Sequence, residues 1–244
     1  MTRLVAVAIA AILASGCAAV TAQTGASAGT LWRFDNLQHI AGYSVRVEGE
    51  PKAIPTPAGP AIAFDGVDDA LFVPAHPLAG AASFTFEAIF RPDGGAFEQR
   101  WFHLAQADPA APAGLYPPVQ ASGPRLMFEI RVVQNSWYLD AFTAGPGYSK
   151  TLVAPEKRFP VGHWYHVAQT YDGHTYRSYV DGQLQSEAPL AFVPQRPGYS
   201  SIGTRINRRN YFHGAVYAAR FTSRALAPKD FMKLPAGLSG SAPH

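Results

Sequence analysis

The stretch SFTFEAIFR, residues 83–91, alternates between two kinds of position. Every second residue is apolar and three of these four are aromatic: Phe84, Phe86, Ala88 and Phe90. The positions between them are Thr85, Glu87, Ile89 and Arg91. A period of two is the side-chain period of a β-strand. The stretch therefore predicts a strand whose aromatic face packs on a core and whose other face is largely polar.

The same alternation recurs along the chain. In residues 125–132, Leu126, Phe128, Ile130 and Val132 oppose Arg125, Met127, Glu129 and Arg131. Further strands are expected at 30–34, 43–48, 60–64, 70–74, 100–105, 137–143, 165–171, 175–181, 199–203 and 214–222. Segments rich in Pro, Gly and Ala at 106–124 and 144–162 are expected to be surface loops, and a single helical turn is expected near 227–233. Short strands without intervening helices predict an all-β sandwich or barrel.

The N-terminal segment has the pattern of a signal peptide. Arg3 is followed by an uninterrupted apolar run at residues 4–13, which is too short to span a bilayer as a helix. Val-Thr-Ala at residues 20–22 fits small-x-small cleavage before Gln23, whereas residues 13–17 resemble a lipobox in which Cys17 would be acylated. We expect an exported protein in the periplasm, on the outer membrane as a lipoprotein, or outside the cell. Any membrane contact would then be made through a lipid at Cys17.

Composition and charge limit the other classes. The 244 residues are 48% hydrophobic and only 15% charged, which is enough apolar material for a sizeable core. Cys17 is the only cysteine, so the mature domain holds no intrachain disulfide and no cysteine-based metal site. The full chain carries a net charge of +3 and has no Lys/Arg run, which argues against nucleic-acid binding. We expect one domain over residues 23–234, a flexible tail over 235–244, and a monomer.

Several segments together resemble the laminin G-like domain of the concanavalin A-like lectin/glucanase superfamily. They lie in the family's order and span roughly residues 31–231: AFDGVDD at 63–69, FTFEA at 84–88, WYHVAQTYDG at 164–173, YVDG at 179–182, IG at 202–203, FHG at 212–214 and RAL at 224–226. The resemblance implies a two-sheet antiparallel jelly-roll sandwich whose curved sheet often binds glycans. Within it we expect Trp164 to be a core residue.

The resemblance also raises the question of calcium. Many relatives carry an Asp-Glu pair near the start of the last strand, and its Asp can support a calcium ion. This chain has Tyr217 and Ala218 at those positions, and a phenol and a methyl group cannot replace a carboxylate. Oxygen ligands remain available from Asp35, Asp65, Asp68 and Asp69. We expect no cofactor, with calcium as the one candidate that these carboxylates leave open.

Polar side chains of the expected strands form the candidate ligand site. If the strands follow one another in one sheet, the non-core positions gather on one surface. Aromatic rings stack on sugars, and Arg or Glu bonds sugar hydroxyls. An ordinary solvent-facing sheet would have a similar polar pattern. The candidate ligand-binding residues are Arg91, Trp101, His103, Arg125, Glu129, Arg131 and Gln169.

A catalytic version uses some of the same residues. Glu87 and Glu129 could serve as the two carboxylates of a glycoside hydrolase, although the E-x-D-x-x-E type motif of related enzymes is absent. A lyase would neutralise a uronate with Arg91 or Arg131 and remove a proton with His103 or Tyr171.

The prediction is an exported, non-catalytic protein that binds a poly- or oligosaccharide. The alternatives are an enzyme that degrades an acidic glycan and an envelope protein-interaction module.

Overall fold

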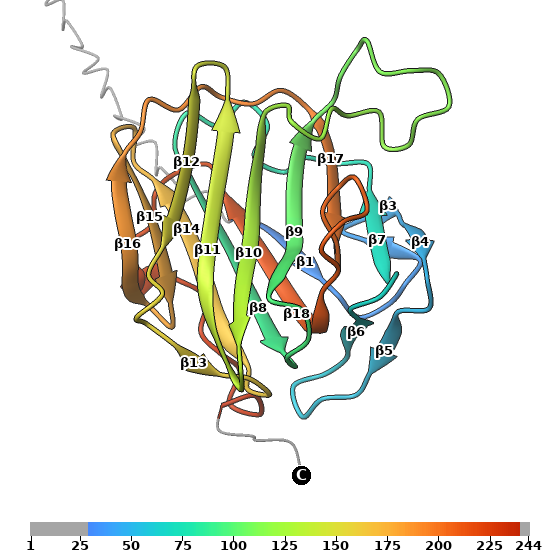
Figure 1. The fold of residues 1–244 in the computed structure, drawn as a ribbon, viewed down its shortest axis with the longest axis vertical. Helices are drawn as coiled ribbons and strands as arrows, with labels where there is room; N and C mark the ends of the chain where they lie inside the picture. Colours follow the sequence, from blue (N-terminus) through green and yellow to red (C-terminus); the bar gives the residue numbers. More distant parts are fainter. Residues whose placement is uncertain (1–28, 240–244) are drawn as a thin grey trace, which may run out of the picture.

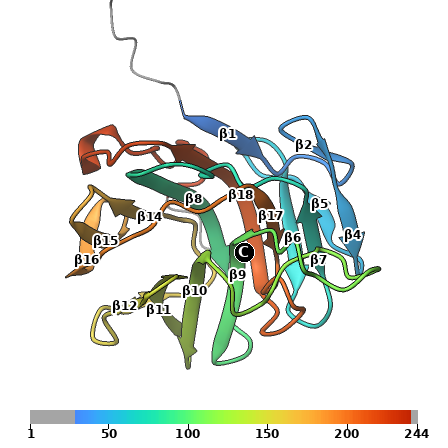
Figure 2. The same cartoon turned by 90° about the horizontal axis from the view of Figure 1, so that it is seen from above.

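The computed structural model describes residues 29–239, which form two large antiparallel sheets packed face to face (Figures 1 and 2). In the back sheet the strand order is β16 (Gln183–Pro189), β15 (Thr175–Val180), β14 (Tyr165–Tyr171), β8 (Phe84–Pro92), β18 (His213–Thr222), β6 (Ala61–Asp65) and β5 (Lys52–Ile54), and β1 (Thr30–Arg33) also pairs with β18. In the front sheet the order is β12 (Tyr148–Val153), β11 (Ser136–Gly145), β10 (Arg125–Val133), β9 (Glu98–Gln106), β17 (Gly198–Ile202), β7 (Ala70–Val73) and β4 (Arg46–Glu48), and β13 (Phe159–Pro160) also pairs with β11. The predicted jelly-roll sandwich is confirmed.

Smaller elements complete the chain. Strands β2 (His39–Ile40) and β3 (Tyr43–Ser44) form a hairpin, and the only helical element in residues 29–239 is a 3-10 turn at Pro228–Asp230. None of the described helical structure is long and apolar enough to cross a membrane. The predicted signal peptide and lipobox at residues 1–22 lie outside the described residues.

Aromatic side chains fill the space between the sheets. The ring of Phe86 on β8 lies 4.4 Å from that of Phe128 on β10, and Phe90 stacks at 4.3 Å on Trp101 of β9. The alternation predicted for residues 83–91 and 125–132 is confirmed, because their apolar faces form this core. Burial of many large apolar side chains is the main driving force for such a sandwich.

A β-bulge in β9 changes which side chains face the core. Phe128 pairs with Phe102, but the next residue, Glu129, pairs with Arg100, so Trp101 has no partner on β10. A bulge of this kind breaks the alternation by one residue. Trp101 and Phe102 consequently both lie in the core, and both are fully buried. The prediction that Trp101 lies on the outer face is therefore wrong.

Strand β14 is buried on both faces, so its sequence does not reveal which side faces the core. The Gln169 amide donates to the carbonyl of Met127 at 2.5 Å and accepts from the Tyr176 hydroxyl at 2.6 Å. The Tyr171 hydroxyl donates to the carbonyl of Leu190 at 2.8 Å and its ring belongs to the core. Gln169 and Tyr171 thus face the core and not the outer surface, contrary to prediction.

The C-terminal segment, residues 224–239, covers the outer face of the back sheet. Its Leu226 and Phe231 pack with Ala168 of β14. Leu238 packs in a second cluster with Trp164, which is buried as expected but outside the core between the sheets. Leu238 is only 1% exposed, so the packed domain extends beyond the predicted boundary at residue 234. Residues 240–244 of the predicted tail lie outside the described residues.

Candidate functional site: the open face of the front sheet

In the described structure, the outer surface of strands β10–β12 has no chain segment packed over it (Figure 1). The C-terminal segment packs on the middle of the back sheet, including β8, β14 and β18, and loops cover the part of the front sheet formed by β7 and β17. There Val119, from the loop between β9 and β10, and Ile206, from the loop between β17 and β18, pack on Phe72 of β7. No segment lies in front of β10, β11 and β12 in Figure 1. We call the outer surface of β9–β12, together with the adjoining loop at residues 203–212 (the Arg205 loop), the polar face.

The polar face contains a depression of about 190 Å³. Residues from four neighbouring strands and one loop line it: Arg100, Arg125, Met127, Glu129, Arg131, Asp140, Phe142, Thr151 and Arg205. The alternation of β10 supplies Arg125, Met127, Glu129 and Arg131. Asp140 is the direct cross-strand partner of Glu129 on β11. The register of the sheet therefore gathers these charges at one place.

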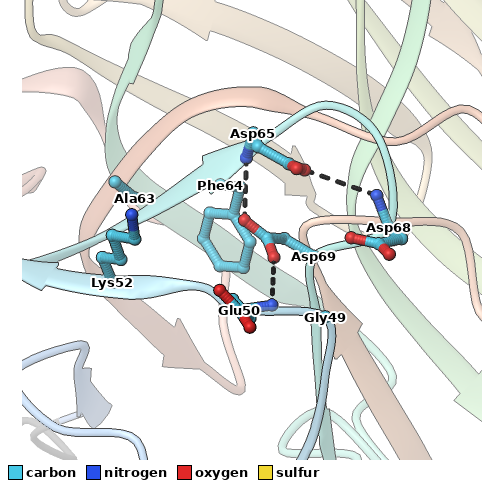
Figure 3. Close-up of a pocket in the computed structure, with 8 residues that line it drawn as sticks. All are labelled: Gly49, Glu50, Lys52, Ala63, Phe64, Asp65, Asp68 and Asp69. Carbon is cyan, nitrogen blue, oxygen red and sulfur yellow. Dashed lines mark hydrogen bonds between the residues drawn. The ribbon is translucent and has the colours of Figure 1, made fainter.

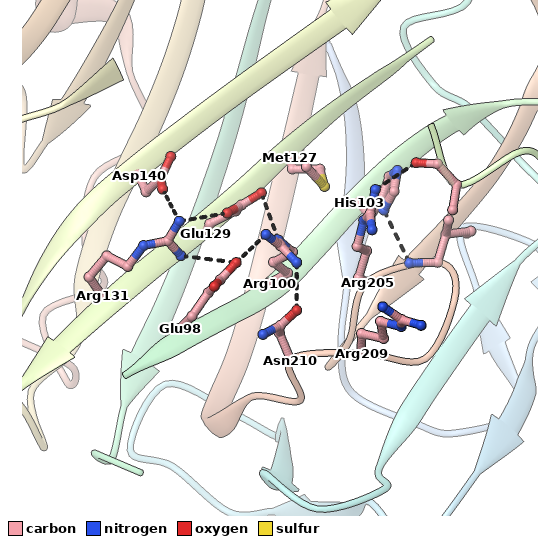
Figure 4. Close-up of polar contacts among 12 residues, drawn as sticks. Glu98, Arg100, His103, Met127, Glu129, Arg131, Asp140, Arg205, Arg209 and Asn210 are labelled. Atoms are coloured by element: carbon pink, nitrogen blue, oxygen red, sulfur yellow. Dashed lines mark hydrogen bonds and ion pairs between the residues drawn. The ribbon is translucent and has the colours of Figure 1, made fainter. Parts of the chain in front are cut away.

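A network of ion pairs holds the centre of the polar face (Figure 4). Arg131 reaches Asp140 at 2.6 Å and Glu129 at 3.3 Å. Arg100 pairs with Glu98 and places its Nε 3.1 Å from Glu129. Both guanidiniums are partly exposed, whereas the Glu129 and Asp140 side chains are only 4% and 2% exposed. The carboxylates thus lie beneath the arginines, and the charge offered to a ligand is positive.

Burial changes the ionisation of the two carboxyl groups. Desolvation, reinforced by the charge of Glu129, raises the pKa of Asp140 to about 7 despite the attraction of Arg131. Desolvation also raises the pKa of Glu129, and the nearby Arg100 and Arg131 oppose that shift. Protonation of Asp140 near neutral pH makes the polar face still more positive.

Aromatic side chains lie beside these charges. The guanidinium of Arg125 lies 4.7 Å from the centre of the Phe142 ring, within the range of a cation–π contact. Arg131 lies 5.9 Å from the ring of Phe97, which is 58% exposed. Tyr138 on β11 is half-buried and is the cross-strand partner of Arg131. Rings and guanidiniums together are the side chains that stack on sugars and bond to paired oxygens.

The structure brings together only part of the predicted site. Arg125, Glu129 and Arg131 lie on the polar face as predicted. His103 lies on the same side of β9 but is fully buried under the Arg205 loop, where its Nδ1 accepts the Ile206 N–H at 3.1 Å. Burial, aided by neighbouring arginines, holds the pKa of His103 well below its usual value. An imidazole enclosed in this way cannot contact a ligand, so it cannot remove a proton from one.

The remaining predicted residues lie elsewhere because the strands do not follow one another in one sheet. After β8 the chain crosses from the back sheet to β9 in the front sheet. Glu87 and Arg91 therefore lie on the opposite outer face from Glu129. Arg91 pairs with Asp93 at 2.7 Å, and Glu87 is fully buried beneath the C-terminal segment. Neither the predicted hydrolase pair nor the predicted lyase sets are assembled.

The predicted site residues did not include other members of the polar face, among them Arg100, Tyr138, Asp140 and Phe142. The alternation of the expected strand 137–143 could have indicated Tyr138, Asp140 and Phe142, because Trp137, Leu139 and Ala141 are its core positions. The bulge concealed Arg100. Arg205 comes from a loop, and nothing in the local sequence predicts where it folds.

The acidic turn considered for calcium forms a separate pocket (Figure 3). Carboxylate oxygens of Asp65, Asp68 and Asp69 lie within 4.8 Å of one another. However, the two oxygens of Asp69 accept the N–H groups of Glu50 at 2.6 Å and of Asp65 at 2.9 Å. Asp65 accepts the N–H of Val67 at 2.8 Å. The carboxylates of Asp65 and Asp69 thus hold the turn through hydrogen bonds, whereas the Asp68 side chain is exposed.

Solved structures with the same fold include sugar-binding domains. Domain 4 of AbnA, a GH43 extracellular arabinanase from Geobacillus stearothermophilus in complex with arabinotriose, is 14% identical, with a TM-score of 0.59 over 83% of this chain and 95% of that chain. The binding domain of botulinum neurotoxin DC in complex with SialylT is 12% identical, with a TM-score of 0.56 over 83% of this chain and 49% of that chain. The ligand-binding domain of botulinum neurotoxin serotype D, in complex with N-acetylneuraminic acid, has the same identity, TM-score and coverage. This chain thus spans about half of each neurotoxin chain.

Family membership rests on a match along the sequence. No curated protein matches the chain. Residues 65–230 match the family described as the concanavalin A-like lectin/glucanases superfamily. This region is more than half of the chain and includes the strands that carry the polar face. The chain therefore belongs to the laminin G-like family of the concanavalin A-like lectin/glucanases superfamily.

Proposed function

We propose that this protein is an exported, non-catalytic module that binds a poly- or oligosaccharide on its polar face. One observation carries the proposal: the polar face is open in the described structure and combines outward guanidiniums with aromatic rings. The fold is shared with domains solved in complex with arabinotriose and with N-acetylneuraminic acid, which adds support.

The chemistry of the polar face suits sugars. Phe97 and Tyr138 offer apolar surface for the C–H face of a sugar ring. Arg100 and Arg131 keep part of each guanidinium exposed while Glu98, Glu129 and Asp140 fix their positions. Fixed donors lose little side-chain entropy on binding, so they favour affinity.

The state of the carboxyl groups argues for binding without catalysis. A glycosidase needs a carboxyl group that can reach the scissile oxygen and a second one that can act as nucleophile or base. Glu129 and Asp140 are adjacent, but both are buried and paired with arginines. We also propose that the protein acts as a monomer and needs no cofactor.

A glycan array followed by titration calorimetry tests the binding proposal. Phe97→Ala and Tyr138→Ala should each weaken binding of the best glycan by about tenfold, as expected for the loss of one stacking contact. Leu184→Ala on β16 of the back sheet is the matched control, because Leu184 is also exposed at 41%. It should leave the affinity unchanged, and adding EDTA should have no effect.

Two results would overturn parts of this proposal. Release of reducing ends, or of unsaturated uronates detected by absorbance, would make the protein an enzyme. If no glycan binds, the carbohydrate proposal fails and the envelope protein-interaction alternative replaces it.

Export is proposed from the sequence alone and has its own test. Mass spectrometry of the native protein should find that residues 1–22, or 1–16 in the lipoprotein case, are missing. Labelling with a clickable fatty acid that is lost in Cys17→Ala would establish the lipid anchor. An intact N-terminus beginning at Met1 would contradict export by this signal.

A further inference from the structure

Two guanidiniums on the polar face have no carboxylate partner. Arg125 donates from Nη1 to the carbonyl of Gly123 at 2.8 Å. Arg205 donates from Nη2 to the carbonyl of Ala121 at 2.7 Å. No ion pair to either residue exists within residues 29–239, whereas Arg100 and Arg131 share three carboxylates. The polar face thus has one neutralised half and one half with unbalanced positive charge.

Both unpaired arginines also keep an unused donor. The Nε–H groups of Arg125 and Arg205, like that of Arg100, are buried and have no hydrogen-bond partner in the described structure, and only Arg125 and Arg205 also lack an ion pair there. A buried donor without an acceptor is unfavourable, and a charged one more so. Arg125 cannot swing freely to water, because its guanidinium is stacked on Phe142 and its Nη1 is bonded to the backbone. These constraints hold the donors ready for an incoming acceptor.

The charge balance of the depression agrees with this reading. Four guanidiniums and two carboxylates line it, which leaves a surplus of two positive charges. Desolvation, and next the positive charge of Arg205, lowers the pKa of Arg125 to about 10. The two guanidiniums therefore repel each other. An anion placed between them would relieve this repulsion and satisfy the open donors. The depression, at about 190 Å³, has room for a single sugar unit rather than a large ligand.

We propose that Arg125 and Arg205 form an anion-binding subsite of the polar face, which receives the carboxylate or sulfate group of one acidic sugar unit. Guanidinium groups bind such planar or tetrahedral oxyanions through paired N–H donors. Thr151 lines the same depression and adds a hydroxyl donor. The inference rests on the proposed carbohydrate function, and it specifies an acidic rather than a neutral glycan.

Paired glycans with the same backbone provide the test. Oligogalacturonate and its methyl ester differ in the carboxylate charge and one methyl group per unit, and dextran sulfate and dextran differ in the sulfates. The charged member of at least one pair should bind tenfold or more tightly at 0.15 M salt, and which pair responds distinguishes carboxylate from sulfate. Arg125→Gln and Arg205→Gln should each reduce this preference by about tenfold, the value of one charge-assisted hydrogen bond.

Controls separate this inference from the proposed function. Arg177→Gln, on β15 of the back sheet, should leave the preference intact. Arg125→Lys keeps the positive charge but loses the paired N–H donors of the guanidinium. It should therefore reduce the preference as Arg125→Gln does. Neutral glycans that bind as tightly as acidic ones would overturn the anion subsite and leave the carbohydrate function standing. A protein that binds none of the four polymers and no array glycan would overturn both.

A direct readout does not depend on a polymer. In NMR spectra of the protein, the Nε–H resonances of Arg125 and Arg205 should shift when glucuronate or inorganic sulfate is added at constant ionic strength. The Nε–H resonance of Arg177, which is already bonded to Glu187 at 2.7 Å, should not move. Equal shifts at all three arginines, or none, would contradict a specific subsite.

Discussion

Trp101 illustrates how one residue can defeat a pattern. Its strand reads as alternating, and alternation around His103 assigns Trp101 to the outer face. The bulge places it instead between Phe90 at 4.3 Å and Phe128 at 5.3 Å. Such a bulge is set by the pairing of two strands, so the sequence of one strand does not announce it. Arg125, Glu129 and Arg131 were placed correctly because their strand, β10, has no bulge and keeps its alternation.

Truncating Trp101 should therefore affect stability. We expect Trp101→Ala to lower the free energy of unfolding by roughly 3–5 kcal/mol, because it empties a large aromatic site in a closed core. Phe97→Ala, at an exposed position, should change it by less than about 0.5 kcal/mol. Urea titrations of both variants provide the measurement. A loss under about 1 kcal/mol for Trp101→Ala would contradict its place in the core.

Asp140 should make stability depend on pH. Its pKa rises from an ordinary 3.8 to about 7 in the folded protein, so the folded state binds a proton more tightly than the unfolded state does. The resulting contribution is full below pH 3.8 and is lost as the pH rises toward 7. Asp140→Asn removes this dependence. The melting temperature of Asp140→Asn relative to the wild type should therefore increase between pH 4 and pH 7, and a constant difference would contradict the raised pKa.

The elements were predicted to different degrees. Most strands lie within one or two residues of their expected positions, because each has a buried face that imposes alternation. Strand β12 lies in the segment expected to be a loop, and β16 was not expected. In β12 only Leu152 is buried, so an edge strand of this kind lacks the pattern that reveals a strand. The C-terminal segment has no periodicity either, although it packs on several strands of the back sheet.

Glu87 binds the C-terminal segment, residues 224–239, to the back sheet. One carboxylate oxygen accepts the Met232 N–H at 2.6 Å and lies 3.0 Å from His166 Nε2, and the other accepts from Arg220 at 2.6 Å. Removing one partner of a buried charge network leaves the others unpaired. Glu87→Ala should therefore destabilise the protein by about 3 kcal/mol and make residues 224–239 sensitive to protease, without changing glycan affinity.

The contribution of Glu87 to stability depends on pH with the opposite sign to that of Asp140. Burial alone would raise the pKa of Glu87, but hydrogen bonds from His166 and Arg220 lower it below its ordinary 4.5. A depressed pKa gives stability that is present above pH 4.5 and is lost as the pH falls through the folded value. The stability gap between the wild type and Glu87→Gln should narrow below pH 4.5. A stability difference that persists to pH 2 would contradict an ionised Glu87 with a lowered pKa.

The whole molecule depends on chain crossings that local sequence does not encode. The alternation of 83–91 and 125–132 was correctly recognised and 165–171 was correctly expected to be a strand, but β8 and β14 belong to the back sheet while β9 and β10 belong to the front sheet. A surface assembled from all of these strands was therefore predicted where two opposite surfaces exist. The family resemblance predicted the class of fold. Which residues lie on which outer face depends on the pairing of strands that are distant in the sequence.

Because the polar face lies on the front sheet alone, glycan binding there should protect only one side of the molecule from hydrogen exchange. Hydrogen exchange with saturating glycan should slow in β10, β11 and the Arg205 loop, because a bound ligand shields their amides and restricts local opening. Exchange in β8 and β14 should stay unchanged, since the C-terminal segment already covers their outer face. Glu87→Ala is the informative companion: it should speed exchange in β8 and leave the glycan footprint on β10 and β11 intact. Protection of β8 by the glycan, or a footprint lost with Glu87, would assign binding to the covered sheet and contradict the polar face.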